Sequence, residues 1–114
     1  MIENDLLSAI QEFTIEAKES EQKKRYRAAV TLYFKALAVS CDLIIYRKIR
    51  KISSDHSERF RLLERHFPEI YKIIDEIFKY YTDTYSKQIT KEYCEKMKGA
   101  LLEIFRLGKI EGTD

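Results

Sequence analysis

The sequence contains few residues that interrupt helices: its 114 residues include three glycines and one proline, and no low-complexity run or solenoid-length repeat. Apolar residues recur instead with the 3.6-residue period of an amphipathic helix. The length is sufficient for one hydrophobic core and too short for two. We therefore expect one all-α domain over residues 1–114, with a frayed tail over residues 110–114.

Long apolar runs are also missing. No stretch of about 18 consecutive apolar residues is present, as a membrane span would require. The N-terminal MIENDLLSAI is acidic and lacks the basic-then-apolar order of a signal peptide. At 45% hydrophobic and 35% charged residues, the composition is that of a globular chain and not of a disordered one. These features predict a cytoplasmic protein without a membrane partner.

Cysteine is scarce, and no pattern of metal ligands is present. Cys41 and Cys94 both fall within helical patterns, and neither has a second Cys or His at metal-ligand spacing. We interpret them as small core residues of a reducing compartment, with a disulfide between them as the alternative. A Gly-rich phosphate loop, H-E-x-x-H and Glu-x-x-His are all missing, so no metal and no cofactor are expected.

The apolar pattern predicts five helices. They cover residues 2–20, 21–51, 56–66 and 68–85, and a last helix that Thr90 caps and that runs to residue 107. Asp55 with Glu58 forms a capping box, Pro68 suits a first helical turn, and Gly108 suits a C-terminal stop. The predicted architecture is an up-and-down four-helix bundle with a short extra helix between the second and fourth helices.

The net charge of +2 hides an uneven distribution. Residues 1–22 carry six acidic residues and one basic residue, whereas residues 23–65 carry twelve basic and four acidic ones. One interpretation is an anionic partner such as a nucleotide, RNA or an acidic protein surface. The other is that oppositely charged helices pack side by side. The sequence does not show whether the basic residues share a face, so both interpretations stay open.

The basic residues are densest around the polar break between the second and third helices, in RKIRKISSDHSERF. The start of a helix offers unpaired backbone N–H groups, and cations beside them can complete an anion site. Two facts argue against such a site: Asp55 already supplies a carboxylate there, and basic residues suit the last turn of any helix. The candidate anion-binding residues are Arg47, Arg50, Lys51, Ser53, Ser54, His56 and Arg59.

Arg50 and His56 also raise the possibility of nuclease chemistry. In that alternative Arg50 stabilises phosphate charge and His56 acts as a general acid–base. However, His56 lies on the apolar stripe of its helix with Phe60, Leu63 and Phe67, which favours a core histidine over a ligand-facing one. With eight arginines in the chain, such spacings also arise by chance. We therefore expect no catalytic residue, with Arg50 and His56 as the alternative.

At this level the sequence resembles the HEPN superfamily. The resemblance rests on the alanine- and tyrosine-rich RAAVTLYFKALAVSCDLII, the loop histidine in SSDHSERFRLLE, and the tyrosine-rich FKYYTDTYSKQIT, and it spans residues 20–107. It implies a helical bundle, commonly a homodimer, that often acts with a small nucleotidyltransferase. Many members resemble ribonucleases or the toxins of toxin–antitoxin pairs, with an R-x(4–6)-H motif at the start of a late helix. Residues 85–100 hold neither Arg nor His at the corresponding place.

The function we expect is therefore a non-catalytic HEPN-like bundle. It would form a homodimer and bind a nucleotide, RNA or a nucleotidyltransferase partner through the basic region around the break between the second and third helices. A metal-independent ribonuclease is one alternative, and a purely structural interaction module is the other.

Overall fold

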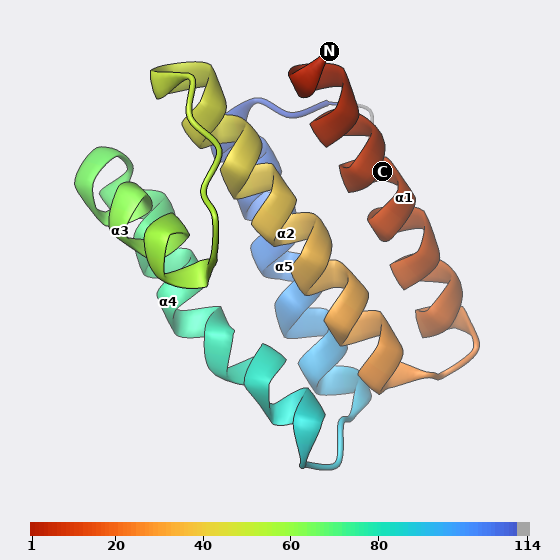
Figure 1. Cartoon of the computed structure of the whole chain (residues 1–114). Helices are drawn as coiled ribbons and strands as arrows, with labels where there is room; N and C mark the ends of the chain where they lie inside the picture. The colour runs from red at the N-terminus through yellow and green to blue at the C-terminus, as the bar shows by residue number, and fades with distance from the viewer. Residues whose placement is uncertain (112–114) are drawn as a thin grey trace.

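The computed structural model describes residues 1–111, and every regular element in this range is helical (Figure 1). This confirms the prediction of an all-α chain, and the helices form a bundle. The elements are α1 (Ile2–Gln22), α2 (Tyr26–Ile49), α3 (His56–His66), α4 (Pro68–Thr82), the single-turn 3₁₀ helix η1 (Asp83–Tyr85) and α5 (Lys91–Gly108).

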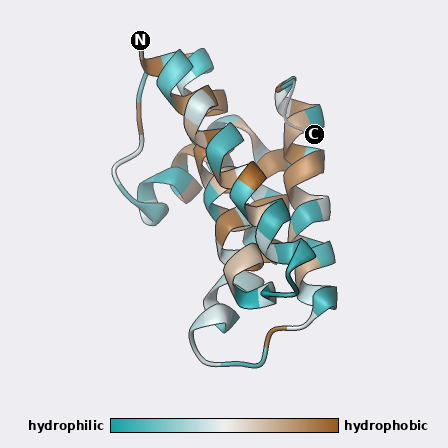
Figure 2. Ribbon diagram, turned by 90° about the vertical axis from the view of Figure 1, so that its right-hand side faces the viewer, coloured by the Kyte–Doolittle hydropathy of each residue, from teal (hydrophilic) through white to brown (hydrophobic). Residues whose placement is uncertain are grey.

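Helix α2 is the centre of the bundle. It contacts α1, α5, α3 and α4, and Figure 1 shows it between α1 on one side and α3 and α4 on the other, with α5 behind. More than half of its side chains are buried, since α2 is apolar on nearly all sides. Along the outer helices, hydrophobic and hydrophilic residues alternate as expected for elements that bury one face (Figure 2).

The composition of α2 would also suit a membrane span. It is the one helix in residues 1–111 that is long and apolar enough to cross a bilayer, with a mean hydropathy of 1.7 over its most apolar 18 residues. The sequence argument from uninterrupted runs missed this property, because a high mean tolerates isolated polar residues. In the structure 72% of that stretch is buried against the other helices, as is typical of the core helix of a bundle.

The boundary between the first two helices differs from the prediction. Residues 21–22 belong to α1, and the chain turns at residues 23–25 before α2 begins at Tyr26. The turn closes through two backbone bonds, from Arg25 N–H to the Ser20 carbonyl and from Lys24 N–H to the Glu21 carbonyl. Lys24 takes the left-handed conformation, with φ 60°, at a position where Gly is usual. Without a Gly, the sequence carried no stop signal here.

The end of α2 and the start of α3 follow the sequence more closely. Helix α3 has the predicted bounds, and the Asp55 carboxylate accepts from Glu58 N–H at 2.8 Å. The Glu58 carboxylate reaches back to Ser54 N–H at 2.8 Å, one residue further than an ideal capping box. Helix α2 stops at Arg50, which is left-handed with φ 57°. The last helical residue of α2 is therefore Ile49, two residues before the predicted end at Lys51.

The helices of the C-terminal part also differ from the predicted ones. The fourth predicted helix divides into α4 and η1, and α5 begins after Thr90, whose side chain makes no capping bond. Gly108 is the last helical residue, and Lys109 takes the left-handed position after it. Gly108 is needed for a different reason, because a Cβ there would lie 2.7 Å from Ile44 Cγ1. The predicted tail from residue 110 begins with the buried side chain of Ile110; residues 112–114 lie outside the described range.

Both cysteines are free and buried, as the core interpretation predicted. Burial raises the pKa of the Cys41 thiol to about 12 and that of the Cys94 thiol to about 12. Neither thiol is a thiolate at neutral pH, so neither is available as a nucleophile.

Candidate functional site

A buried acid on α2 holds in place the loop between α2 and α3 (residues 50–55), which we call the hinge. Asp42 stands within the apolar face of α2, and its side chain is 10% exposed. Arg59 of α3 donates to both carboxylate oxygens, from Nε to Oδ1 at 2.9 Å and from Nη2 to Oδ2 at 3.1 Å. Ser53 Oγ donates to Oδ1 at 2.6 Å. This fork-shaped pairing holds the loop and α3 against α2, with the desolvated charges compensated.

The third guanidinium nitrogen of Arg59 contacts His56. Arg59 Nη1 lies 2.7 Å from His56 Nδ1. A guanidinium can only donate, so Nδ1 must accept, and the neutral imidazole carries its proton on Nε2. The ring packs beside Phe34 and Phe78, with centroid distances of 5.8 and 5.7 Å. The His56 ring is thereby held in one orientation with a defined tautomer.

The same surroundings keep the imidazole neutral. Burial of the ring against its aromatic neighbours and then the positive charge of Arg59 lower the pKa of His56, and Lys35 lowers it further. Asp42 and Asp55 act in the opposite direction without reversing the shift. His56 is therefore a hydrogen-bond donor at neutral pH and not a cation.

His56 does not occupy the place that its stripe predicted. Leu63 is fully buried and Phe60 is half-buried, but His56 as a residue is exposed. The stripe turns toward the core at Leu63 and reaches the edge of the bundle at His56. There the imidazole has one side against aromatic rings and another open to solvent. The prediction of a core histidine is wrong in this respect.

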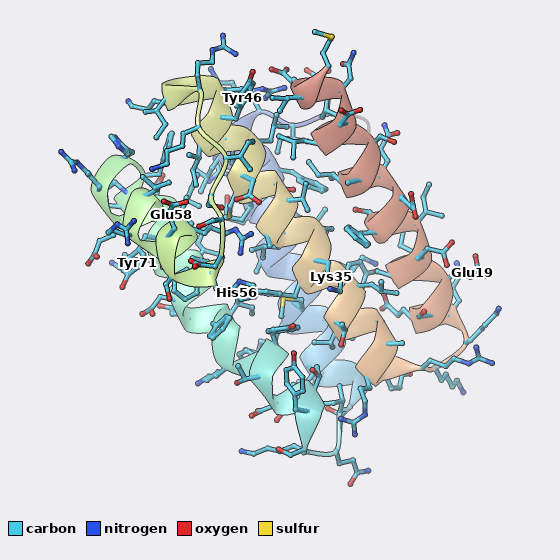
Figure 3. The ribbon with its side chains drawn as sticks, viewed as in Figure 1. Glu19, Lys35, Tyr46, His56, Glu58 and Tyr71 are labelled. Carbon is cyan, nitrogen blue, oxygen red and sulfur yellow. The ribbon has the colours of Figure 1, made fainter. Side chains whose placement is uncertain are left out.

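A cavity of about 210 Å³ opens beside this histidine, and we call it the His56 pocket. Lys35 of α2 lines it, is exposed, and makes no ion pair within residues 1–111. Figure 3 shows Lys35 and His56 on the same side of the molecule, one from α2 and the other from the start of α3. The lining residues are Phe13, Phe34, Lys35, Ala38, Val39, His56, Arg59 and Tyr81.

The pocket combines aromatic walls with positive charge. Phe34 stacks face to face on Tyr81, at a centroid distance of 4.2 Å and an interplanar angle of 13°. Because Phe34 is buried, the half-buried Tyr81 ring is the more accessible aromatic wall of the pocket. No carboxylate lines the cavity, since Asp42 is held behind Arg59. Lys35 and His56 Nε2–H supply a cation and a neutral donor. This arrangement suits a ligand that has both a planar ring and an anionic group.

The other residues predicted for the hinge site serve different contacts. Arg47 pairs with Glu3 of α1 at 3.0 Å, and the Arg50 guanidinium lies over the Tyr46 ring at 5.3 Å. Lys51 pairs with Glu58 at 3.2 Å. Of the seven candidates, Ser53 and Arg59 bond to Asp42, and His56 bonds to Arg59. His56 and Arg59 also line the His56 pocket, and the other five candidates do not.

The first turn of α3 is already occupied by carboxylates. Glu58 N–H donates to Asp55, and Ser54 uses both its N–H and its hydroxyl on Glu58. The Ser54 N–H bond and then Lys51 lower the pKa of Glu58, so this carboxylate stays ionised beside the loop. An anion at this helix start would have to displace it.

Sequence reasoning missed Asp42, Lys35 and the stacked rings of Phe34 and Tyr81. Asp42 carried a detectable signal, because a lone acid inside the apolar run AVSCDLII requires a buried cation. Lys35 is the one basic residue between Arg27 and Arg47, but a single lysine on a helix does not by itself indicate a site. The Phe34–Tyr81 stack joins residues on α2 and α4, and periodicity within a helix does not reveal such a pairing.

Comparison with protein-family models, with curated proteins and with solved structures finds no match to this chain. Function is therefore inferred from the chemistry of the pocket itself.

Proposed function

We propose that this chain is a non-catalytic, HEPN-like bundle of up-and-down helices that binds a nucleotide, free or as a unit of RNA, in the His56 pocket. One observation carries the proposal: Lys35 and a neutral, oriented His56 stand beside the stacked rings of Phe34 and Tyr81 in a cavity without a carboxylate. A base can pack against the half-buried Tyr81 ring while a phosphate meets the Lys35 ammonium and the His56 Nε2–H.

The Asp42–Arg59 pair has a positioning role in this proposal. Arg59 is neutralised by Asp42, so its main contribution is to hold His56 and not to supply net charge. Lys35 is then the principal cation of the pocket. Affinity for a mononucleotide should be modest and should fall as salt rises, as expected when one exposed ammonium contacts phosphate.

The experiment is a titration of the full chain with ATP and with a short single-stranded RNA at two salt concentrations. We expect salt-sensitive binding, and a loss of about tenfold in Lys35→Gln, since a hydrogen bond to a charged group contributes about 1.5–3 kcal/mol. Lys72→Gln, on the exposed face of α4, is the matched control for a loss of one positive charge. Absence of binding at low salt would end the proposal.

The ribonuclease alternative drew on Arg50 and His56 together. The cavity beside His56 is lined by Arg59 and Lys35, and Arg50 stands over Tyr46 instead. We make no proposal of nuclease chemistry from that pair. An RNA-cleavage assay of the wild type beside His56→Ala checks this choice: equal, background-level cleavage agrees with it, and cleavage that depends on His56 contradicts it.

A homodimer, or a complex with a nucleotidyltransferase, remains part of the proposed function. What supports self-association is a groove of about 580 Å³ between α4 and α5, with Ile73, Ile77, Tyr80 and Ala100 among its lining. Its rim carries three carboxylates and two lysines, a mixture that can complement a second copy. Sedimentation of the chain at several concentrations tests this part separately from nucleotide binding.

A further inference from the structure

Four lysines gather at the end of the bundle where α1 ends and where α2 and α5 begin, the lower end in Figure 1. They line a cavity of about 530 Å³ together with Glu21, Gln22 and Tyr26, and we call this cavity the lysine basin. The lysines are Lys18, Lys24, Lys91 and Lys98. The basin shares no residue with the His56 pocket, so it is a separate feature of the surface.

The charge in the basin is unbalanced. One carboxylate, Glu21, faces the four ammonium groups, and its single ion pair is with Lys98 at 3.7 Å. Lys18, Lys24 and Lys91 have no ion pair within residues 1–111. Like charges that share a cavity repel one another, and a bound anion relieves this repulsion. The basin therefore has an excess of three positive charges.

Glu21 is already committed to the protein. Its Oε1 accepts from Tyr33 O–H at 2.7 Å, and Tyr33 is fully buried. Burial and then this hydrogen bond raise the pKa of Tyr33 well above its usual value, so the phenol remains a donor. Because Tyr33 fixes Glu21, Glu21 in turn positions the Lys98 ammonium at one wall. The basin thus has a charge-paired wall, Glu21 with Lys98, and three further lysines without an ion pair within residues 1–111.

The start of α2 adds to the positive potential. Its first turn contains no acidic residue and its N-cap residue, Arg25, makes no side-chain capping bond. The preceding turn contributes Lys23, Lys24 and Arg25, and within residues 1–111 Lys23 alone of these pairs with an acid, Glu19 at 3.3 Å.

We propose that the lysine basin binds a ligand with adjacent phosphate groups, of the inorganic pyrophosphate or oligophosphate class. Three uncompensated ammonium groups call for an anion of several charges within a small volume, which a single carboxylate does not provide. Lysine binds phosphate as a compact point charge without needing the fixed fork of arginine, so several lysines around one cavity suit a compact oligophosphate. This site is additional to the nucleotide pocket.

The test is a titration of the full chain with inorganic pyrophosphate and tripolyphosphate at low salt, followed by calorimetry and by amide chemical shifts. We expect binding with shifts around Tyr26, Lys91 and Lys98, and weakening by at least about tenfold in Lys24→Gln/Lys91→Gln. Lys72→Gln/Lys96→Gln removes the same charge from exposed positions on α4 and α5 outside the basin, and should change affinity by less than about twofold.

Three results would overturn the proposal. The first is no binding of either phosphate compound at low salt. The second is equal weakening in the two double variants, which would mean that overall charge and not the basin binds the anion. The third is equally tight binding of an oligoglutamate peptide of the same charge, which would remove the preference for phosphate. Because His56→Gln leaves the basin intact, its effect on ATP binding reports on the nucleotide pocket alone.

Discussion

The basic side chains around the hinge fall into two groups that make different kinds of contact. At the end of α2, Arg47 and Lys51 each pair with an exposed or half-exposed acid, and Arg50 lies over an aromatic ring. In the middle of α2 and the start of α3, Arg59 and His56 are organised by one buried carboxylate, Asp42. The first group is dispersed along a helix end, whereas the second forms the wall of a cavity.

A single buried acid therefore predicts the position of a site better than a high density of basic residues does. Exposed cations near the end of a helix interact favourably with its dipole and its carbonyls, wherever their side chains point. A buried aspartate leaves no such freedom, because its desolvated charge must be matched by a donor at a fixed place. Asp42 thus determines where Arg59 lies, and Arg59 determines where His56 lies.

The largest expected effect is from removal of the buried acid. Asp42→Ala leaves the Arg59 guanidinium, 11% exposed, and Ser53 Oγ without their acceptor. We expect a loss of about 3–5 kcal/mol in the free energy of unfolding, because breaking a buried pair leaves an uncompensated charge. Urea denaturation measures it.

The matched control is the exposed pair in the other group. Glu3→Ala removes the acceptor of Arg47, whose side chain is 35% exposed, and should cost less than about 1 kcal/mol. Similar losses in the two variants would contradict the contrast between the two groups. Asp42→Leu/Arg59→Met should recover much of the loss, since replacing both charges leaves neither one unpaired.

A smaller effect concerns the pH dependence of stability. The pKa of His56 is lowered by its burial and by Arg59, so the folded state takes up a proton less readily than the unfolded state. Well above about pH 6.5 both states are neutral at this residue and its contribution is constant. As the pH falls below that value, the unfolded state is protonated first and stability decreases.

His56→Gln should remove this part of the decrease, whereas His66→Gln should leave it in place. Urea denaturation at pH 7.5 and pH 5.5 measures both. An unchanged pH dependence in His56→Gln would show that Arg59 and the aromatic rings do not disfavour the imidazolium.

The smallest expected effect is a gain. Arg50 is left-handed at the end of α2, with φ 57°, and its guanidinium makes no ion pair within the described chain. Glycine adopts this conformation without the steric cost of a Cβ. We expect Arg50→Gly to change the free energy of unfolding by about 0–1 kcal/mol in the stabilising direction, as thermal unfolding can show. A marked loss would indicate that the contact of Arg50 with the Tyr46 ring outweighs the relief of the backbone.

Much of the fold follows from the sequence, because helix periodicity and helix caps are local. The Asp55 cap and Pro68 fixed the bounds of α3 and the start of α4 in advance. The boundary at residues 23–25 could not be predicted in the same way, since Lys24 stands where Gly would have marked it.

The site was less predictable, because it depends on contacts between helices. Ser53, His56 and Arg59 were among the predicted residues, but Asp42, which accepts from Ser53 and Arg59, was not. The aromatic stack pairs Phe34 on α2 with Tyr81 on α4, 47 positions away in the chain, and no local pattern relates the two residues.

The most direct test of the account compares nucleotide binding in two variants of similar construction. Lys35→Gln/His56→Gln alters the His56 pocket, and Arg47→Gln/Arg50→Gln alters the end of α2. Both should remain folded, and ATP titration at low salt measures their affinities beside the wild type. We predict a loss of at least about tenfold in the first variant and less than about twofold in the second. A greater loss in the Arg47→Gln/Arg50→Gln variant would place the binding site at the helix end and contradict the account.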